Sequence, residues 1–204
     1  MFVASNLSWL MKHADVYHSM LRDRGRQFVT RHRWTLELDE SGLERDAFDD
    51  GLTQYCIWMK DGRHAASLRL RRAKYGSMAE VHFPALWRRE LSSAVEITRL
   101  CASPYLAAED QSRAVSDLLI GLCRYCQRYD INSLFGIVFP SALRAIRRSG
   151  WAADVLESHE TSDGPLLLAQ WKPSELVAWN IEERTAKREE NRSRSIKISE
   201  RLVA

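Results

Sequence analysis

The sequence predicts a mixed α/β fold, a three-layer αβα sandwich whose central sheet is mostly antiparallel. Two apolar runs, Gln54–Met59 and His64–Arg71, are separated by a turn that contains Asp61-Gly62, which is a strong hairpin signal. Residues Glu109–Tyr129 carry a stripe of apolar side chains at helical spacing. Strand and helix patterns alternate downstream of the hairpin, so that helices are expected to cover one sheet.

The segment before the hairpin is expected to hold a helix and a long loop. Residues 1–9 are predicted to form a short strand or an arm, and apolar residues from Ala14 to Val29 recur at roughly helical spacing. Residues 30–53 are polar and contain two turn signals that end in glycine. Because ordered loops of this length in compact domains are usually functional, this loop is expected to contribute to a site.

The segment after the hairpin continues with alternating elements, although residues 78–87 show no clear pattern. Residues 1–174 are predicted to form one domain, and the charged segment 175–204, which lacks aromatic residues after Trp179, is predicted to be a helix or a frayed tail. The other expected elements are a strand over Ala94–Ala102 with one polar face, a buried strand over Ser133–Phe139, a helix over Pro140–Arg148 and a hairpin of Trp151–Leu156 with Pro165–Trp171.

Composition indicates a soluble globular protein. The 204 residues are 45% hydrophobic and 28% charged, and no apolar run approaches the roughly 20 residues that span a bilayer. No secretory signal is recognisable, so a cytoplasmic location and no membrane partner are expected. Cys123 and Cys126 lie inside a helical pattern without a second pair of cysteines, which predicts no metal site.

The formal net charge is only +3, but the basic residues are unevenly distributed. One interpretation is a solvated basic face, and the other is a docking surface for an acidic macromolecule or a phosphate-bearing carrier. No nucleic-acid partner is expected. The two basic segments contain Lys60, Arg63, Arg69, Arg71, Arg72 and Lys74, and Arg124, Arg128, Arg144, Arg147 and Arg148.

Charged and aromatic residues recur between Arg24 and Arg99 at loop positions and strand ends. The chain has no G-x-S-x-G motif, H-E-x-x-H motif or Walker loop, and isolated residues such as His64 are expected to be structural. The pattern instead suits a zwitterion with a second cation, since carboxylates bind ammonium, arginines bind carboxylate and an aromatic face binds sulfonium. The candidate residues are Asp46, Asp49, Glu96, Arg24, Arg69, Arg99, Phe28, Trp34 and Phe83.

This series resembles the LuxI-type acyl-homoserine-lactone synthases, the autoinducer synthases of bacterial quorum sensing. The resemblance rests on the motifs in sequence, since each one alone is weak, and it extends loosely to the strand near Trp171. Two departures are His32-Arg33 before Trp34, where the family usually has Leu-Gly, and Leu100 in place of phenylalanine. The matching residues are Arg24-x-x-x-Phe28, Trp34, Glu44-x-Asp46-x-Phe48-Asp49, Ser67-Leu68-Arg69-Leu70, Phe83 and Glu96-Ile97-Thr98-Arg99.

The resemblance implies an N-acetyltransferase-like (GNAT-like) fold and two substrates, with no permanently bound cofactor. These substrates are S-adenosylmethionine and an acyl thioester carried on acyl carrier protein or coenzyme A. The methionine amine would attack the thioester, and the methionine carboxylate would then close the lactone and expel methylthioadenosine. The carrier would dock on the basic surface.

The resemblance also implies roles for single residues. Glu96 would act as the base, Asp46 and Asp49 would hold S-adenosylmethionine, and Arg24 and Trp34 would fold the loop over it. Arg69 and Arg99 would pair with these carboxylates or with those of the substrate, and backbone N–H groups near Thr98–Cys101 would bind the oxyanion. The acyl chain would lie among Phe83, Leu100, Cys101, Gly136, Val138 and Phe139.

Two other classes remain open at this point. An acetyl-coenzyme-A N-acetyltransferase would use a glycine-rich loop to bind pyrophosphate, but residues 102–108 contain no glycine. A non-catalytic protein that binds acyl carrier protein or a nucleic acid through the basic patches would explain the arginines and would leave Asp46, Asp49 and Glu96 without a role.

Overall fold

A seven-stranded sheet runs through the computed structural model, which describes residues 1–203 and the side chains of residues 1–194. The strand order is β1-β2-β3-β4-β5-β7-β6, and every neighbouring pair is antiparallel except β4 with β5. The predicted hairpin is confirmed as β2 and β3. The strands are β1 (Phe2–Asn6), β2 (Gln54–Lys60), β3 (Arg63–Arg72), β4 (Val95–Ala102), β5 (Leu134–Val138), β6 (Asp154–His159) and β7 (Leu166–Trp171).

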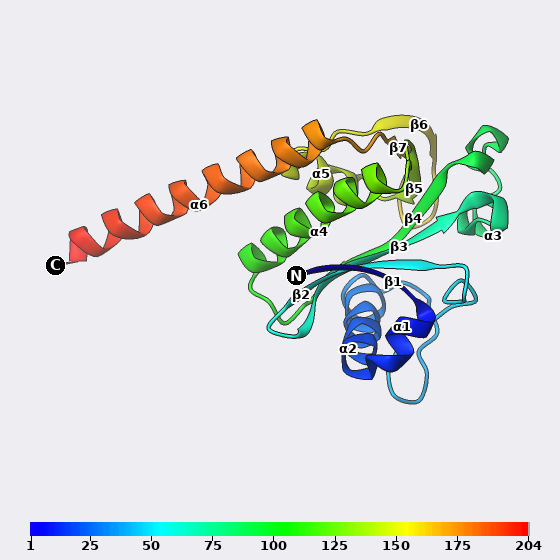
Figure 1. Cartoon of the computed structure of the whole chain (residues 1–204), viewed down its shortest axis with the longest axis horizontal. Helices are drawn as coiled ribbons and strands as arrows, with labels where there is room; N and C mark the ends of the chain where they lie inside the picture. The colour runs from blue at the N-terminus through cyan, green and yellow to red at the C-terminus, as the bar shows by residue number, and fades with distance from the viewer. Residues whose placement is uncertain (204) are drawn as a thin grey trace.

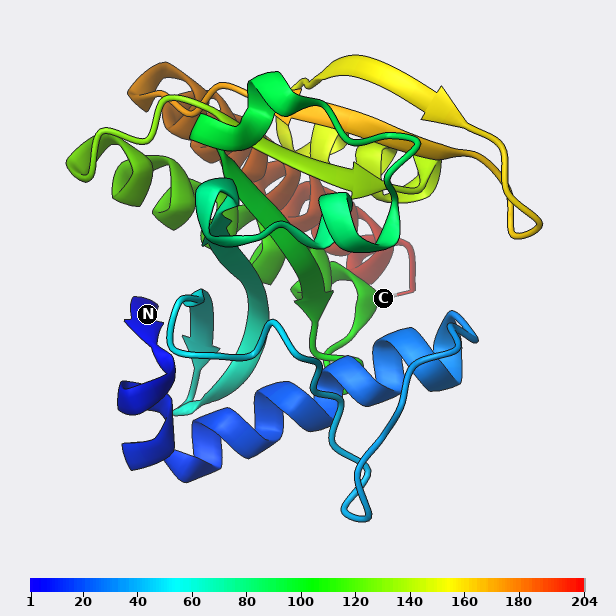
Figure 2. The ribbon, with the colours of Figure 1, turned by 90° about the vertical axis from the view of Figure 1, so that its right-hand side faces the viewer.

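Helices cover both faces of the sheet, which confirms the predicted three layers (Figures 1 and 2). Helices α1 and α2 lie on one face, and α4, α5 and α6 lie on the other. The ambiguous segment 78–87 contains the short helix α3. The bounds are α1 (Leu7–Lys12), α2 (Ala14–Gly25), the π-helical turn η1 (Arg26–Arg31), the 3₁₀ turns η2 (Ala73–Tyr75) and η3 (Arg89–Ser93), α3 (Met78–His82), α4 (Ala108–Arg128), α5 (Pro140–Ser149) and α6 (Glu175–Val203).

The central strand β3 separates an apolar core from a polar site. Its residues from His64 to Arg71 are all buried, because both of its faces are covered. Leu68 and Leu70 belong to the main core under α4, whereas Arg69 and Arg71 point to the opposite face. The alternation of side chains along β3 therefore places charge on the α2 side of the sheet.

The parallel strands β4 and β5 remain paired for only a short distance. Val95 pairs with Leu134 and Glu96 with Phe135, after which the register ends. A Cβ atom on Gly136 would lie 2.7 Å from the carbonyl oxygen of Ile97, so only glycine permits this approach. Beyond Glu96, the edge of β4 that faces β5 has no strand partner.

Helix α6 accounts for the charged segment at the end of the chain. Ala178 and Ile181 are fully buried in the main core, and ion pairs of 2.7 Å join Arg124 to Glu182 and Arg192 to Glu109. Of the two predicted alternatives, the structure has a helix over Glu175–Val203, and residue 204 lies outside the described residues. The first turns of this helix complete the core, while its far end projects beyond α4 (Figure 1).

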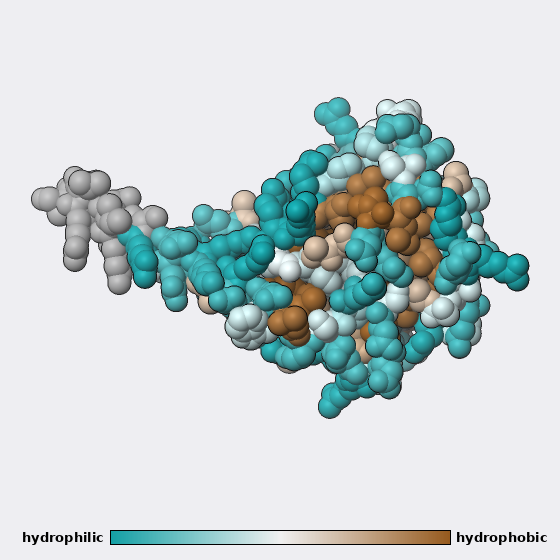
Figure 3. Space-filling model, turned by 90° about the horizontal axis from the view of Figure 1, so that it is seen from above, coloured by the Kyte–Doolittle hydropathy of each residue, from teal (hydrophilic) through white to brown (hydrophobic). Residues whose placement is uncertain are grey.

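Exposed apolar side chains occur on the edge strand β6 and on α6. Val155 and Leu156 of β6, and Leu176 and Trp179 of α6, are between 43% and 66% exposed. Figure 3 views this upper side of the molecule, where apolar side chains gather within a polar surface. In the part of the chain that the structure describes, no helix is long and apolar enough to cross a membrane.

Candidate functional site

Arg24 of α2 is held between two carboxylates of the long loop. Its Nε atom donates to Glu44 at 2.5 Å, and its two terminal nitrogens each donate to Asp49 at 2.9 Å. The second contact is the two-pronged geometry that makes arginine–carboxylate pairs strong and directional. The loop is therefore fixed to the end of α2.

Arg69 of β3 and Arg99 of β4 extend these contacts across the sheet. Arg69 donates to both oxygens of Asp46, at 2.5 and 2.9 Å, and lies 3.1 Å from Asp49. Arg99 donates to Glu44 at 3.0 Å and to Asp46 at 2.8 Å. The three arginines and three carboxylates (Arg24, Arg69, Arg99, Glu44, Asp46 and Asp49) form one charge-balanced cluster, here called the ion-pair network.

Most of the ion-pair network is shielded from water. The side chains of Arg24, Glu44 and Asp49 are 1% exposed, whereas that of Asp46 is 23% exposed. Burying paired charges contributes little net stability, because desolvation offsets their attraction. An arrangement that leaves one carboxylate open to solvent is therefore better explained by binding than by stability.

The network also determines the charge states of its members. Burial acts to raise the pKa of Asp49, but the hydrogen bonds and charge of Arg24 outweigh it and lower that pKa. Burial also acts to raise the pKa of Asp46, but the hydrogen bonds and charge of Arg69 outweigh it and lower that pKa. Burial acts to lower the pKa of Arg24, yet Asp49 raises it. Both carboxyl groups therefore remain ionised near neutral pH.

Local sequence explains how the loop presents its carboxylates. The Asp46 carboxylate accepts a hydrogen bond from the backbone N–H of Phe48, and the Asp49 carboxylate accepts one from the N–H of Asp46. Short-range hydrogen bonds of this kind stabilise turns and are typical of aspartate. A Cβ atom on Gly25 would lie 2.9 Å from the carbonyl oxygen of Gly42. Glycine at the end of α2 therefore allows the loop to approach the helix.

Two of the three aromatic candidates, Phe28 and Trp34, form a stacked pair near Arg99. The rings of Phe28 and Trp34 are stacked with centroids 4.8 Å apart, and the Trp34 ring lies 5.9 Å from that of Phe139. The Arg99 guanidinium lies 5.7 Å from the Phe28 ring. The structure thus brings the predicted Phe28 and Trp34 to the edge of the ion-pair network.

Glu96 lies on the same face of the sheet but has its own partners. It is 2% exposed, and its two oxygens accept the N–H groups of Met78 and Ala79, each at 2.7 Å. Burial raises the pKa of Glu96, and these N–H groups and Arg69 offset only part of that effect. Each oxygen retains a second lone pair that can accept a proton.

The structure divides the residues predicted to hold the acyl chain between several surroundings. Leu100 and Val138 pack against the main core, and Phe83 and Phe139 pack against a separate cluster near α3. Thr98 accepts a hydrogen bond from Arg69 at 3.1 Å. Cys101 is buried beside Asp23 and Arg24, and Gly136 lies against β4. These residues therefore do not form one wall.

Sequence reasoning did not assign roles to two members of this site. Glu44 accepts hydrogen bonds from both Arg24 and Arg99. It lies within the acidic motif that the sequence identified, but no role was predicted for it. The Tyr55 hydroxyl donates to Asp49 at 2.9 Å, and nothing in the sequence distinguishes this tyrosine from an ordinary strand residue.

Two members of the first basic segment do not lie on a basic surface, so the prediction is wrong for them. Arg69 and Arg71 are 2% and 9% exposed, and Arg71 pairs with Asp50 at 2.6 Å. In the second segment, Arg144 and Arg147 are exposed on α5. Among residues 1–194, whose side chains are described, no carboxylate forms an ion pair with either of them.

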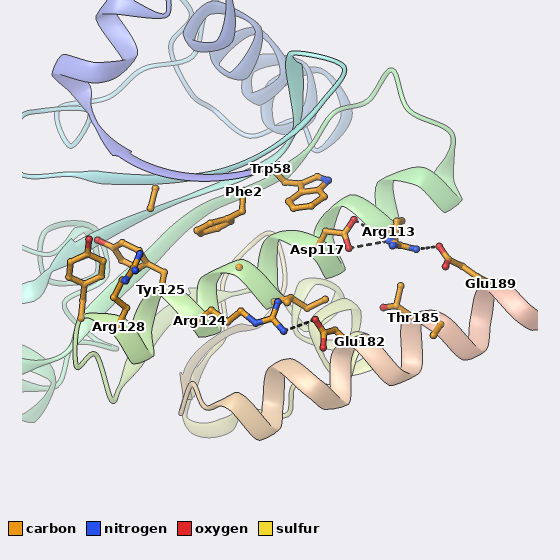
Figure 4. A pocket seen from close by; sticks show the side chains of 15 residues that line it. Phe2, Trp58, Arg113, Asp117, Arg124, Tyr125, Arg128, Glu182, Thr185 and Glu189 are labelled. Atoms are coloured by element: carbon orange, nitrogen blue, oxygen red, sulfur yellow. Dashed lines mark hydrogen bonds and ion pairs between the residues drawn. The ribbon is translucent and has the colours of Figure 1, made fainter.

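A groove of about 770 Å³ lies on the opposite face of the sheet, between β1, β2, α4 and α6 (Figure 4). Phe2, Trp58 and Tyr125 form its apolar side, and the Arg124–Glu182 pair crosses its rim. No member of the ion-pair network lines it. Within the described residues, no group of three His, Cys, Asp or Glu side chains is arranged to hold a metal ion.

Known proteins resemble this chain in sequence. The profile of the autoinducer synthase family matches residues 8–174. An acyl-homoserine-lactone synthase of Pectobacterium carotovorum subsp. carotovorum is 25% identical over 161 residues, which cover 70% of this chain and 73% of the relative. An acyl-homoserine-lactone synthase of Dickeya dadantii (strain 3937) is 24% identical over 138 residues, and the chain spans 64% of the length of that relative.

Solved structures share the fold. BjaI, a CoA-dependent acyl-homoserine lactone synthase solved with MTA, superposes with a TM-score of 0.78 at 20% identity, covering 91% of this chain and 89% of BjaI. An acyl-CoA N-acyltransferase from Pseudomonas aeruginosa superposes with a TM-score of 0.53 at 17% identity, covering 84% of this chain and 99% of that one. The acyltransferase-like fold is thereby confirmed. Because the family profile covers most of the sequence, the chain belongs to the autoinducer synthase family, and the curated relatives described above are named acyl-homoserine-lactone synthases.

Proposed function

We propose that this enzyme acylates the amine of S-adenosylmethionine from an acyl thioester and lactonises the product to an N-acyl-homoserine lactone, releasing methylthioadenosine. The observation that carries the proposal is the ion-pair network, which opens to solvent at Asp46 beside the unpaired edge of β4. Among proteins of similar fold, BjaI has been solved with SAM and isopentyl-CoA, and TofI with an inhibitor and MTA.

Asp46 is the member of the network best placed to bind S-adenosylmethionine. The Asp49 side chain is only 1% exposed, so it is enclosed within the network. Asp46 is ionised and 23% exposed, so its carboxylate can attract the substrate ammonium in addition to the hydrogen bonds that its oxygens accept from Arg69 and Arg99. In this proposal Asp49 and Glu44 hold the arginines, while Phe28 and Trp34 offer aromatic faces to the sulfonium.

Glu96 is proposed as the base that removes the proton from the ammonium, directly or through one water molecule. An ammonium group is not a nucleophile until it loses a proton. Burial raises the pKa of Glu96, which makes its carboxylate a stronger base than an exposed glutamate. The backbone N–H groups of Met78 and Ala79 hold this carboxylate in a fixed orientation.

The thioester is proposed to lie along the edge of β4 after Glu96. Arg99 has a φ of 55°, which distorts the strand where its register with β3 shifts. Backbone N–H groups of Thr98–Cys101 are the proposed donors to the oxyanion that forms when the amine attacks. Collapse of that intermediate forms the amide and expels the carrier thiol. The methionine carboxylate oxygen then attacks the carbon next to sulfur, forming the lactone and breaking the bond to methylthioadenosine.

Acyl carrier protein is proposed to dock on α5. This helix starts at Pro140, directly after Phe139, whose ring contacts Trp34 at the site. Arg144 and Arg147 are exposed and unpaired among the described side chains, so they can attract an acidic carrier. The cytoplasmic location and the absence of a nucleic-acid partner remain predictions.

The proposed reaction predicts that methylthioadenosine is released from S-adenosylmethionine only when an acyl thioester is added. The measurement is chromatography of methylthioadenosine with acyl carrier protein or coenzyme A as the acyl donor, together with mass spectrometry of the lactone. A simple N-acyltransferase would release the carrier thiol without methylthioadenosine. That result, or no turnover with any donor, would contradict the proposal.

The base assignment predicts that Glu96→Gln lowers kcat about a hundredfold and leaves the affinity for S-adenosylmethionine nearly unchanged. Because the pKa of Glu96 is raised above 4.5, the ionised form that accepts the proton is lost as the pH falls toward that raised value. The acid limb of kcat/KM should therefore lie above pH 4.5 and disappear in the variant.

Glu90→Gln, at an exposed glutamate of η3, is the matched control and should behave like the unsubstituted enzyme. Full turnover of Glu96→Gln, with the acid limb retained, would show that another group takes the proton.

The docking proposal predicts that Arg144→Glu with Arg147→Glu raises KM for acyl-carrier-protein donors about tenfold, because reversed charge repels an acidic partner. The KM for the same acyl group on coenzyme A should change much less. Arg22→Glu, at an exposed arginine of α2 on the opposite face, is the control. An equal change for both donors, or none, would place the docking surface elsewhere.

A further inference from the structure

A second buried polar chain lies next to the ion-pair network and has no part in the proposed chemistry. The Nδ1 atom of His64 lies 2.7 Å from an Asp23 oxygen, and its Nε2 atom lies 2.9 Å from the Ser67 hydroxyl. All three residues are at most 4% exposed. His64, which the sequence suggested was an isolated structural histidine, is therefore the centre of an Asp–His–Ser chain.

The distances match those of a serine nucleophile, its base and an orienting carboxylate. The surroundings do not suit that role, because Ser67 is 1% exposed and lies beneath α2 in the middle of the sheet. A substrate carbonyl could reach the hydroxyl only if α2 moved away. Its neighbour across the strands, Cys101, is also buried, and burial raises the pKa of that thiol. The geometry thus argues against covalent catalysis by this chain.

The Asp23–His64–Ser67 chain joins the same two elements that the network joins. Asp23 directly precedes Arg24 in the last turn of α2, and Ser67 lies two residues before Arg69 on the same face of β3. Asp49 contacts both Arg24 and Arg69. A shift of α2 along β3 would therefore lengthen at least one of these contacts.

Stability alone is a poor reason to bury this chain. Replacing a buried ionic pair by apolar side chains is often neutral or stabilising, whereas satisfied polar networks select one arrangement of the elements they connect. Arg24 must keep two carboxylates within 2.9 Å, which leaves little tolerance for movement of α2. A fixed, directional contact between α2 and β3 meets this need.

We propose that Asp23, His64 and Ser67 are positioning residues that lock the end of α2 onto β3 and thereby hold Arg24 and the loop carboxylates in the geometry that binds S-adenosylmethionine. This proposal rests on the proposed function. Variants of these residues should bind one substrate more weakly and leave the binding of the other unchanged. In the proposed function Arg24 and the loop face S-adenosylmethionine, whereas the acyl donor lies along β4.

The test is steady-state kinetics of Asp23→Asn, His64→Leu and the double variant. Each single change should raise KM for S-adenosylmethionine about tenfold, since small misplacements of binding groups reduce rates by up to about a hundredfold. The KM for the acyl donor should stay within about twofold, and the double variant should resemble the single ones because the chain acts as a unit. Asp15→Asn and His18→Gln, at exposed positions of α2, are the matched controls.

Amide hydrogen exchange gives a readout that does not require turnover. The Glu44 N–H donates to the carbonyl of Leu21 in α2 at 3.2 Å, so its exchange reports how the loop sits on the helix. In Asp23→Asn and the milder Ser67→Ala, exchange over residues 44–49 should accelerate, while exchange in α4 should not. Unchanged exchange would contradict the positioning role, whatever the enzyme's activity.

Two other outcomes would also overturn the proposal. One is an equal rise in KM for both substrates with a lowered melting temperature, which would indicate a general role in stability. The other is an acyl adduct on Ser67 in intact-protein mass spectrometry, which would indicate a nucleophile. Absence of methylthioadenosine release by the unsubstituted enzyme would refute the proposed function, and the exchange comparison would still decide the positioning role.

Discussion

The structure depends on the alternation of arginines and carboxylates in the ion-pair network. Arg24, Arg69 and Arg99 come from α2, β3 and β4, and the loop supplies the carboxylates that join them. Each carboxylate of the network contacts two arginines, so no charge is buried without a partner. The same contacts that fold the loop onto the sheet therefore leave Asp46 ionised at the opening of the site.

The sheet makes this arrangement possible by separating its two faces. Along β3, alternate residues send Leu68 and Leu70 into the apolar core under α4, and Arg69 and Arg71 to the side of the loop. Helices α4 and α6 complete that core. The α2 side of β3 can thus hold charged side chains beside the apolar cluster that α1 and α2 form with β2. The separation of β4 from β5 after Glu96 leaves backbone groups without a strand partner. The two-residue periodicity of β3 therefore places the apolar core and the charged site on opposite faces of the sheet.

Local patterns in the sequence were sufficient for the hairpin at Asp61-Gly62, the helix that became α4 and the grouping of Arg24 with Asp46 and Asp49. They could not show that Arg69 and Arg71 are buried, because the sequence of a basic segment is the same whether its side chains face solvent or form buried ion pairs. Nor could they show the contact of Asp23 with His64, which are 41 residues apart and meet only through packing of α2 on β3. The residues predicted around the acyl chain come from β4, β5 and the ends of α3 and β5, and they pack into different clusters through tertiary contacts that the sequence does not specify.

We propose that the partly exposed carboxylate of Asp46 binds the ammonium of S-adenosylmethionine. The most direct measurement is isothermal titration calorimetry of S-adenosylmethionine with Asp46→Asn, compared with Asp50→Asn, whose carboxylate pairs with Arg71 outside the network. We expect Kd to rise about tenfold or more in Asp46→Asn, because a charged hydrogen bond to the ammonium is lost, and to stay unchanged in Asp50→Asn. Equal affinity in the unsubstituted enzyme and Asp46→Asn, with the fold intact, would contradict it.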